Sequence, residues 1–138
     1  MSTLKKHLNR HRQSGQTMRA HLNADALFAT IREDFGKVLD HRAANASIPL
    51  ADALMSAFAM FSLKDPSLLA FDERRSERPE SLHGVYGVGV IPSDTQMRTI
   101  LDEVAPTQLR SAFRSVFHQL QRGKVLPKMT CLDGHLLL

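Results

Sequence analysis

Residues 48–71 read IPLADALMSAFAMFSLKDPSLLAF, and this stretch decides the fold class. From residue 50 to 61 the chain is apolar on almost every side of a helix, which is typical of a helix in the centre of a bundle. The sequence then predicts a second helix, with Asp65 as N-cap and Pro66 in the first turn. The stretch therefore predicts a mainly helical protein, a small multi-helix bundle organised around one buried helix.

No part of the sequence is typical of a membrane or secreted protein. Asp52, Ser56 and Ser62 interrupt the apolar run, so it falls short of the roughly 20 residues that a membrane-spanning helix needs. The first twenty residues are polar and basic and do not resemble a secretory signal. Cys131 is the only cysteine, which excludes an internal disulfide or a multi-cysteine zinc site. These features predict a cytoplasmic protein with no membrane partner.

Positive charge gathers at the start of the chain. The 138 residues carry a formal charge of +4, and residues 1–24 contain five basic residues and no acid. Those residues are Lys5, Lys6, Arg10, Arg12 and Arg19. An acid-free cationic arm favours contacts with phosphates or with an anionic membrane surface. A solvated arm that becomes ordered only on DNA is equally compatible with this composition.

Helical periodicity is also found before residues 48–71. Apolar residues over 27–38 follow the spacing of one helix face, with Asn23 or Asp25 available as its N-cap and Gly36 weakening its end. Residues 40–47 are polar and predict a linker. This part of the chain therefore adds one amphipathic helix to the bundle.

Two further helices are predicted after the central stretch. Ser93 to Gln96 has the form of a capping box, so a helix should begin at Asp94. A second helix should follow Pro106 and stop at Gly123, because its apolar residues recur with helical spacing. Those apolar residues are Leu109, Ala112, Phe113, Val116, Phe117 and Leu120.

Basic residues recur on the polar side of this last helix. Arg110, Arg114, His118 and Arg122 are spaced four apart, and Arg98 lies on the preceding helix. Two helices joined by a short connection, the second with a basic stripe, are compatible with a helix-turn-helix unit that contacts duplex DNA. A helical hairpin with a solvated polar face has the same pattern. With no Trp and a single Tyr, nucleic-acid binding would depend on charge and helices rather than on aromatic stacking.

The remaining motifs are weaker. The glycines of HGVYGVGV, residues 83–90, do not follow a strand and open a helix, so they predict an irregular connection rather than a nucleotide-binding loop. Cys131, Asp133 and His135 alternate as on one strand face, and His7 and His11 have helical spacing, so either set can be drawn as a metal site. Neither spacing is specific. The hydrolase and kinase motifs are absent from the sequence.

Three blocks together resemble a known family. FSLKDPSLLAF at 61–71, PSDTQMR at 92–98 and LDG at 132–134 resemble the N-terminal part of the DDE-type transposases of bacterial insertion sequences. The resemblance extends over about residues 30–138. It implies a helical region followed by a catalytic domain with an RNase-H-like fold, and it implies DNA, in particular terminal inverted repeats, as the partner.

The resemblance also implies a catalytic position. In this family the first strand of the catalytic domain ends in the first acid of an Asp-Asp-Glu triad, which maps onto Asp133 by its place in the LDG block. In a full-length relative that acid would bind Mg²⁺, and two such ions would activate water and then a 3′-hydroxyl. One carboxylate cannot hold two ions, so we expect this chain alone to be neither an enzyme nor a binder of a cofactor.

Three regions follow from these observations. Residues 1–24 are expected to be a flexible basic arm, 25–126 the helical N-terminal transposase region, and 127–138 the truncated start of the RNase-H-like domain, with a short strand. The function predicted is that of a truncated transposase which retains DNA binding. Two alternative functions remain: a non-enzymatic DNA-binding regulator of transposition, or a non-functional gene remnant. The possible assemblies are a homo-oligomer and a hetero-oligomer with full-length transposase.

Overall fold

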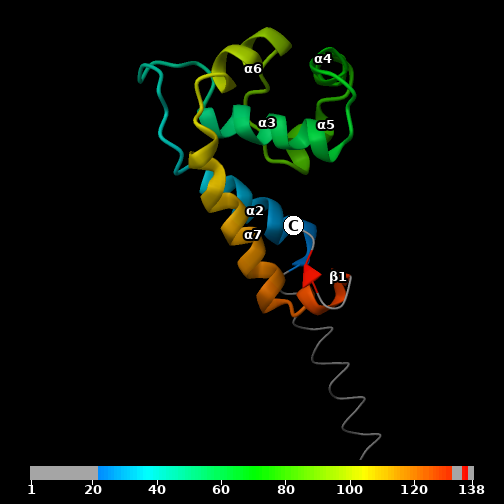
Figure 1. Ribbon diagram of the computed structural model, residues 1–138. Coiled ribbons are helices and arrows are strands. Elements are labelled where there is room, and N and C mark those ends of the chain that lie inside the picture. Colours follow the sequence, from blue (N-terminus) through cyan, green and yellow to red (C-terminus); the bar gives the residue numbers. More distant parts are fainter. Residues whose placement is uncertain (1–21, 132–134, 137–138) are drawn as a thin grey trace, which may run out of the picture. The chain divides into compact units, whose positions relative to one another are not determined.

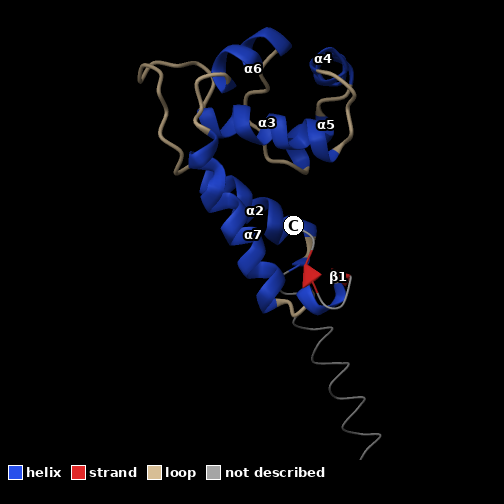
Figure 2. Ribbon diagram, in the orientation of Figure 1, coloured by secondary structure: helices blue, strands red, loops and turns tan. Residues whose placement is uncertain are grey.

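The computed structural model describes residues 22–131 and 135–136, and it is mainly helical (Figures 1 and 2). The α-helices are α2 (Ala24–Phe35), α3 (Leu50–Ser62), α4 (Leu68–Glu77), α5 (Glu80–Gly84), α6 (Asp94–Leu101) and α7 (Arg110–Arg122). Short 3-10 helices occupy Pro106–Leu109 and Leu126–Lys128. The predicted multi-helix fold is confirmed. None of the described helices combines the length and the apolar character that crossing a membrane requires.

The chain divides into two compact units. Residues 31–112 form one, which we call the middle unit. The other, which we call the terminal unit, includes the described residues 22–30, 113–131 and 135–136. In the terminal unit, β1 (Thr130–Cys131) and β2 (His135–Leu136) pair antiparallel, with Thr130 opposite Leu136. A pair this short does not test the predicted first strand of an RNase-H-like sheet, which stays a prediction.

Helix α3 is the core of the middle unit, as the apolar stretch predicted. Its residues from Leu50 to Ala59 are buried on several sides, and α6 packs against both α3 and α4. Phe71 of α4 and Met97 of α6 are almost completely buried in the same core. The predicted apolar face nevertheless ends early: Phe61, in the last turn of α3, is 74% exposed because it lies beyond the covered part of the helix.

The N-cap predicted for the next helix is wrong. Ser67, not Asp65, caps α4, and its hydroxyl accepts a hydrogen bond from the backbone N–H of Ala70. Asp65 instead accepts hydrogen bonds from both Nε and Nη2 of Arg74, with Nη2–Oδ1 at 2.6 Å. A buried carboxylate is more strongly stabilised by a bidentate arginine than by one backbone N–H. The pair therefore ties the segment before α4 to the last turn of that helix.

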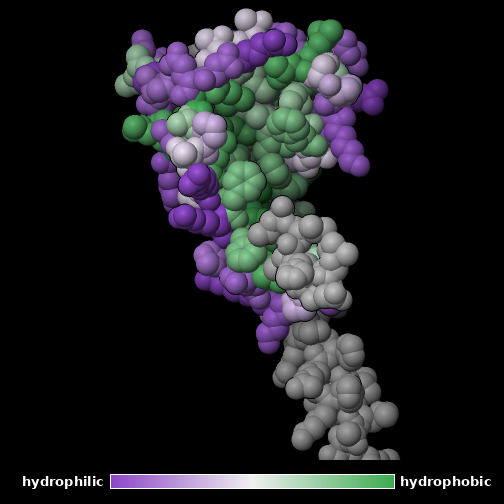
Figure 3. Space-filling model, in the orientation of Figure 1, coloured by the Kyte–Doolittle hydropathy of each residue, from purple (hydrophilic) through white to green (hydrophobic). Residues whose placement is uncertain are grey.

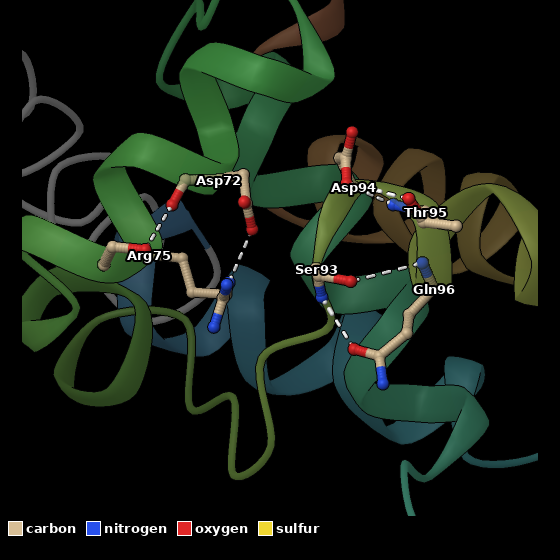
Figure 4. A network of polar contacts seen from close by, with 7 residues as sticks. Asp72, Arg75, Ser93, Asp94, Thr95 and Gln96 are labelled. Atoms are coloured by element: carbon tan, nitrogen blue, oxygen red, sulfur yellow. Dashed lines mark hydrogen bonds and ion pairs between the residues drawn. The ribbon is translucent and has the colours of Figure 1, made fainter.

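Other caps agree with the sequence. The reciprocal Ser93 and Gln96 hydrogen bonds form the predicted capping box, and α6 begins at Asp94 (Figure 4). The side chain of Asn23 accepts from the N–H of Ala26, so Asn23 is the cap of α2. Figure 4 also shows the ion pair between Asp72 and Arg75 of α4, whose side chains are half-buried.

The end of α7 differs in detail from its prediction. The helix stops at Arg122, but the left-handed residue after it is Lys124, with φ 55°, rather than Gly123. Gly123 instead allows Leu22 to pack closely against the backbone, because a Cβ at this position would lie 2.6 Å from Cδ1 of Leu22. The glycine thus lets the chain before α2 reach the end of α7 within the terminal unit.

One buried hydroxyl gives a test of this core. The side chain of Ser56 is fully buried in α3, and its Oγ has no hydrogen-bond partner among the described residues. We expect Ser56→Ala to raise the free energy of unfolding by roughly 1 kcal/mol, because it removes an unsatisfied polar group. Ser62→Ala is the control: it deletes the acceptor of the Tyr86 hydroxyl and should be destabilising. Urea denaturation of both variants measures the difference, and a loss of stability in Ser56→Ala would contradict the prediction.

Candidate nucleic-acid interface

Charge is divided unequally between the two units. The middle unit contains nine Lys and Arg against twelve Asp and Glu, which gives −3. The described part of the terminal unit contains four basic residues against Asp25 alone, which gives +3. Residues 1–21, which lie outside the described part, add five basic residues and no acid. An anionic partner is therefore attracted to the terminal unit.

Five of the nine Lys and Arg residues of the middle unit form ion pairs with described acids. All ion pairs found among the described residues lie within residues 31–112. The basic partners in them are Arg32, Lys37, His41, Arg42, Arg74 and Arg75. In one of these pairs, the hydrogen bond from Arg42 lowers the pKa of the Asp40 carboxyl. The five Lys and Arg side chains in these pairs are neutralised locally and have little charge left for a partner.

The arginines of helix α7 differ from the paired cations of the middle unit. Arg110, Arg114, His118 and Arg122 are all exposed, and none of the three arginines forms an ion pair with a described residue. The only acid of the chain outside the described residues is Asp133. Residues 104–132 carry five basic residues and no acid. Figure 3 shows hydrophilic residues along one side of this helix.

The other side of α7 packs against the protein. Ala112 is buried, and Gln119 donates a hydrogen bond from Nε2 to Oγ1 of Thr30 on α2. Phe113 was predicted to belong to this apolar face but is 75% exposed. Phe113 lies at the edge of the apolar side of α7. This side is wider than the part of the helix that other described residues cover. The basic side of α7 therefore has a fixed orientation toward solvent and an exposed aromatic ring at its border.

The structure places the other predicted DNA contacts as follows. Arg98 is exposed on α6, in the middle unit, and forms no ion pair with a described residue. Because α6 belongs to the middle unit and most of α7 to the terminal unit, the helix-turn-helix arrangement stays a prediction. The arm residues lie outside the described residues; they are Lys5, Lys6, Arg10, Arg12 and Arg19.

Of the predicted catalytic and metal positions, the structure describes Cys131 and His135, which lie opposite each other in the β1–β2 pair and not on one strand as predicted. Asp133, His7 and His11 lie outside the described residues. Among the side chains that the structure describes, no three His, Cys, Asp or Glu are grouped as metal ligands. A hollow of about 270 Å³ lies between the 42–48 loop and α6, but Arg42, its one charged residue, already donates to Asp40 and to the Ile48 carbonyl.

A buried ion pair was missed in the sequence. Arg32 Nη2 of α2 lies 2.7 Å from Oδ1 of Asp52 on α3, and the Asp52 side chain is only 3% exposed. The second carboxylate oxygen accepts from the backbone N–H of Val90 at 2.8 Å. A Cβ at Gly89 would lie 3.1 Å from that oxygen, and Gly87 has φ 65°. The glycine-rich segment therefore packs its backbone against a carboxylate. Residues 85–90 are irregular, as predicted, whereas His83 and Gly84 belong to α5.

The comparisons with known proteins add no relative. No family model matches the chain, and no curated protein or solved structure matches it either.

Proposed function

We propose that this chain is the DNA-binding N-terminal region of a DDE-type DNA transposition enzyme. One observation carries the proposal: α7 presents exposed arginines, unpaired with any described acid, within a segment that has no acid over 104–132. The three sequence blocks that resemble these transposases are the reason for naming this class of DNA-binding protein. The proposed ligand is duplex DNA at the ends of a mobile element.

Phosphate chemistry favours this partner. Lys and Arg that neutralise phosphates release condensed counterions, and this supplies most of the affinity for DNA. An anionic membrane surface is the competing partner for a basic helix, but a helix that binds a membrane inserts its apolar face into the lipid. In α7 that side carries the buried Ala112 and the Gln119 hydrogen bond to Thr30. The geometry therefore supports DNA over a membrane.

The proposal assigns recognition to this chain and phosphodiester chemistry to a full-length relative. Cleavage by a two-metal mechanism needs several carboxylates around two ions. Within these 138 residues the resemblance assigns one, Asp133, which would bind Mg²⁺ in such a relative. As a DNA-binding chain it would act with full-length transposase in a shared complex or compete with it for the terminal repeats.

The salt dependence of binding tests this function. We expect the purified full chain to bind a duplex with an affinity that falls steeply with salt. Arg110→Gln with Arg122→Gln should lower the slope of log K against log salt by about 1.8, at roughly 0.9 per phosphate. The charge-matched control is Lys64→Gln with Arg78→Gln, in the middle unit, which should leave the slope unchanged. Fluorescence anisotropy at several salt concentrations measures both. Equal effects of the two double variants would contradict the proposal.

The arm gives a second measurement. Replacement of Lys5, Lys6, Arg10 and Arg12 by Ala should weaken binding to every duplex by a similar factor, because flexible basic arms contact phosphates and carry little sequence information. A variant that weakens binding to one sequence alone would show that the arm contacts bases. Unchanged affinity on all duplexes would remove the arm from the interface.

A further inference from the structure

The basic side of α7 has defined dimensions. In an α-helix each step of four residues advances by about 40° around the axis and about 6 Å along it. Arg110 and Arg122 are therefore separated by about 120° around the helix and about 18 Å along it. Arg114 and His118 lie between them, near about 40° and 80°. All four side chains are exposed.

This arc matches the shape of the major groove. A helix with its side chains is about 10–12 Å wide, and the major groove of B-DNA is about 12 Å wide. When such a helix lies in the groove, side chains in the middle of the exposed arc face the base edges. Side chains at the two margins face the phosphates of the groove walls. The arc contains no acid, so no position on it repels either strand.

The side chains at the middle of the arc are suited to bases. An arginine can donate two hydrogen bonds to O6 and N7 of guanine. His118 Nδ1 lies 3.3 Å from Oε1 of Gln121. That contact engages Nδ1, which leaves Nε2 as the ring nitrogen for a base edge. Every base pair presents hydrogen-bond donors or acceptors in the major groove, so Nε2 has a partner there.

We infer that α7 enters the major groove with Arg114 and His118 toward the base edges and with Arg110 and Arg122 toward phosphates on the two walls. This inference rests on the proposed function, and it adds the groove, the division of roles and a guanine as the base contacted by Arg114. It follows from the exposed, acid-free arc of α7 and from the positions of the four side chains on it.

Lysine substitutions separate the two roles. Lysine keeps the charge that a phosphate requires but loses the planar pair of donors that guanine requires. A preferred duplex is first selected from a random pool with the full chain. Arg110→Lys and Arg122→Lys should then keep both the affinity and the preference for this duplex over a scrambled one, within about twofold. Arg114→Lys should reduce that preference by roughly 5- to 150-fold, the range for loss of one bidentate base contact.

Each outcome has a separate meaning. Loss of preference in Arg114→Lys with retention in the other two variants supports the inference. Retained preference in Arg114→Lys, or lost preference in Arg110→Lys, overturns the division of roles. Salt-dependent binding without any preferred duplex also overturns it, and yet leaves the proposed DNA binding in place. If the unaltered chain binds no duplex, the proposed function itself fails. Circular dichroism of each variant confirms that the helix content of the chain is retained.

Discussion

Arg32→Met is expected to lower the free energy of unfolding by about 3–5 kcal/mol, the cost of removing one partner of a buried ion pair. The side chain of Asp52 is 3% exposed, so after this substitution its charge stays buried with the Val90 N–H as its remaining hydrogen-bond donor. Methionine retains the apolar stem that packs beside Gly87. The loss therefore comes from the charge and not from a cavity.

The converse substitution should cost less. Asp52→Asn leaves Arg32 unpaired, but the arginine side chain is 38% exposed and water can solvate it. The asparagine oxygen can still accept from the N–H of Val90. We expect a loss of about 1–3 kcal/mol. Glu33→Gln, in an exposed ion pair with Lys37, is the control and should change stability by less than about 1 kcal/mol.

Urea denaturation of the three variants gives the order directly. Arg32→Met should be the least stable, then Asp52→Asn, then Glu33→Gln. If Asp52→Asn proved less stable than Arg32→Met, the unpaired guanidinium of Arg32 would cost more than the uncompensated carboxylate of Asp52. An Arg32→Met variant as stable as the control would show that the pair contributes nothing to the core.

Phe71→Ala should also cost about 3–5 kcal/mol, the range for deleting a buried aromatic ring. Phe71 is completely buried in α4, in the core that α6 closes. Phe61→Ala is a matched control in the same unit, since the identical change at a side chain that is 74% exposed leaves no cavity. Its cost should stay below about 1 kcal/mol. Similar losses at the two positions, measured by urea denaturation, would contradict the burial described here.

Local patterns predicted most of the helices. The capping box at Ser93, the cap at Asn23 and the burial of α3 each depend on residues within a few positions of one another, so spacing alone identifies them. The N-cap of α4 was predicted wrongly because Asp65 is used by Arg74, nine residues away. Local propensity cannot anticipate a partner that only the folded chain brings near.

The same limit applies to the sites. The stripe of Arg110, Arg114 and Arg122 follows from helical spacing, but its lack of described acidic partners became visible only in the structure. The Arg32 to Asp52 pair joins residues 20 positions apart, and Val90 follows 38 positions later. In the sequence, Asp52 was merely an interruption of an apolar run. A buried charge is recognisable only once its distant partners are known.

Tyr86 gives the chain a spectroscopic reporter of its own. It is the only tyrosine in a sequence without tryptophan, and it is buried against Phe58 with its hydroxyl donating to Ser62. Tyrosine emission and its near-ultraviolet dichroism therefore monitor residues 31–112, while amide dichroism monitors helices throughout the chain. If the two signals change at different urea concentrations, the units melt in separate steps; if they coincide, unfolding is cooperative.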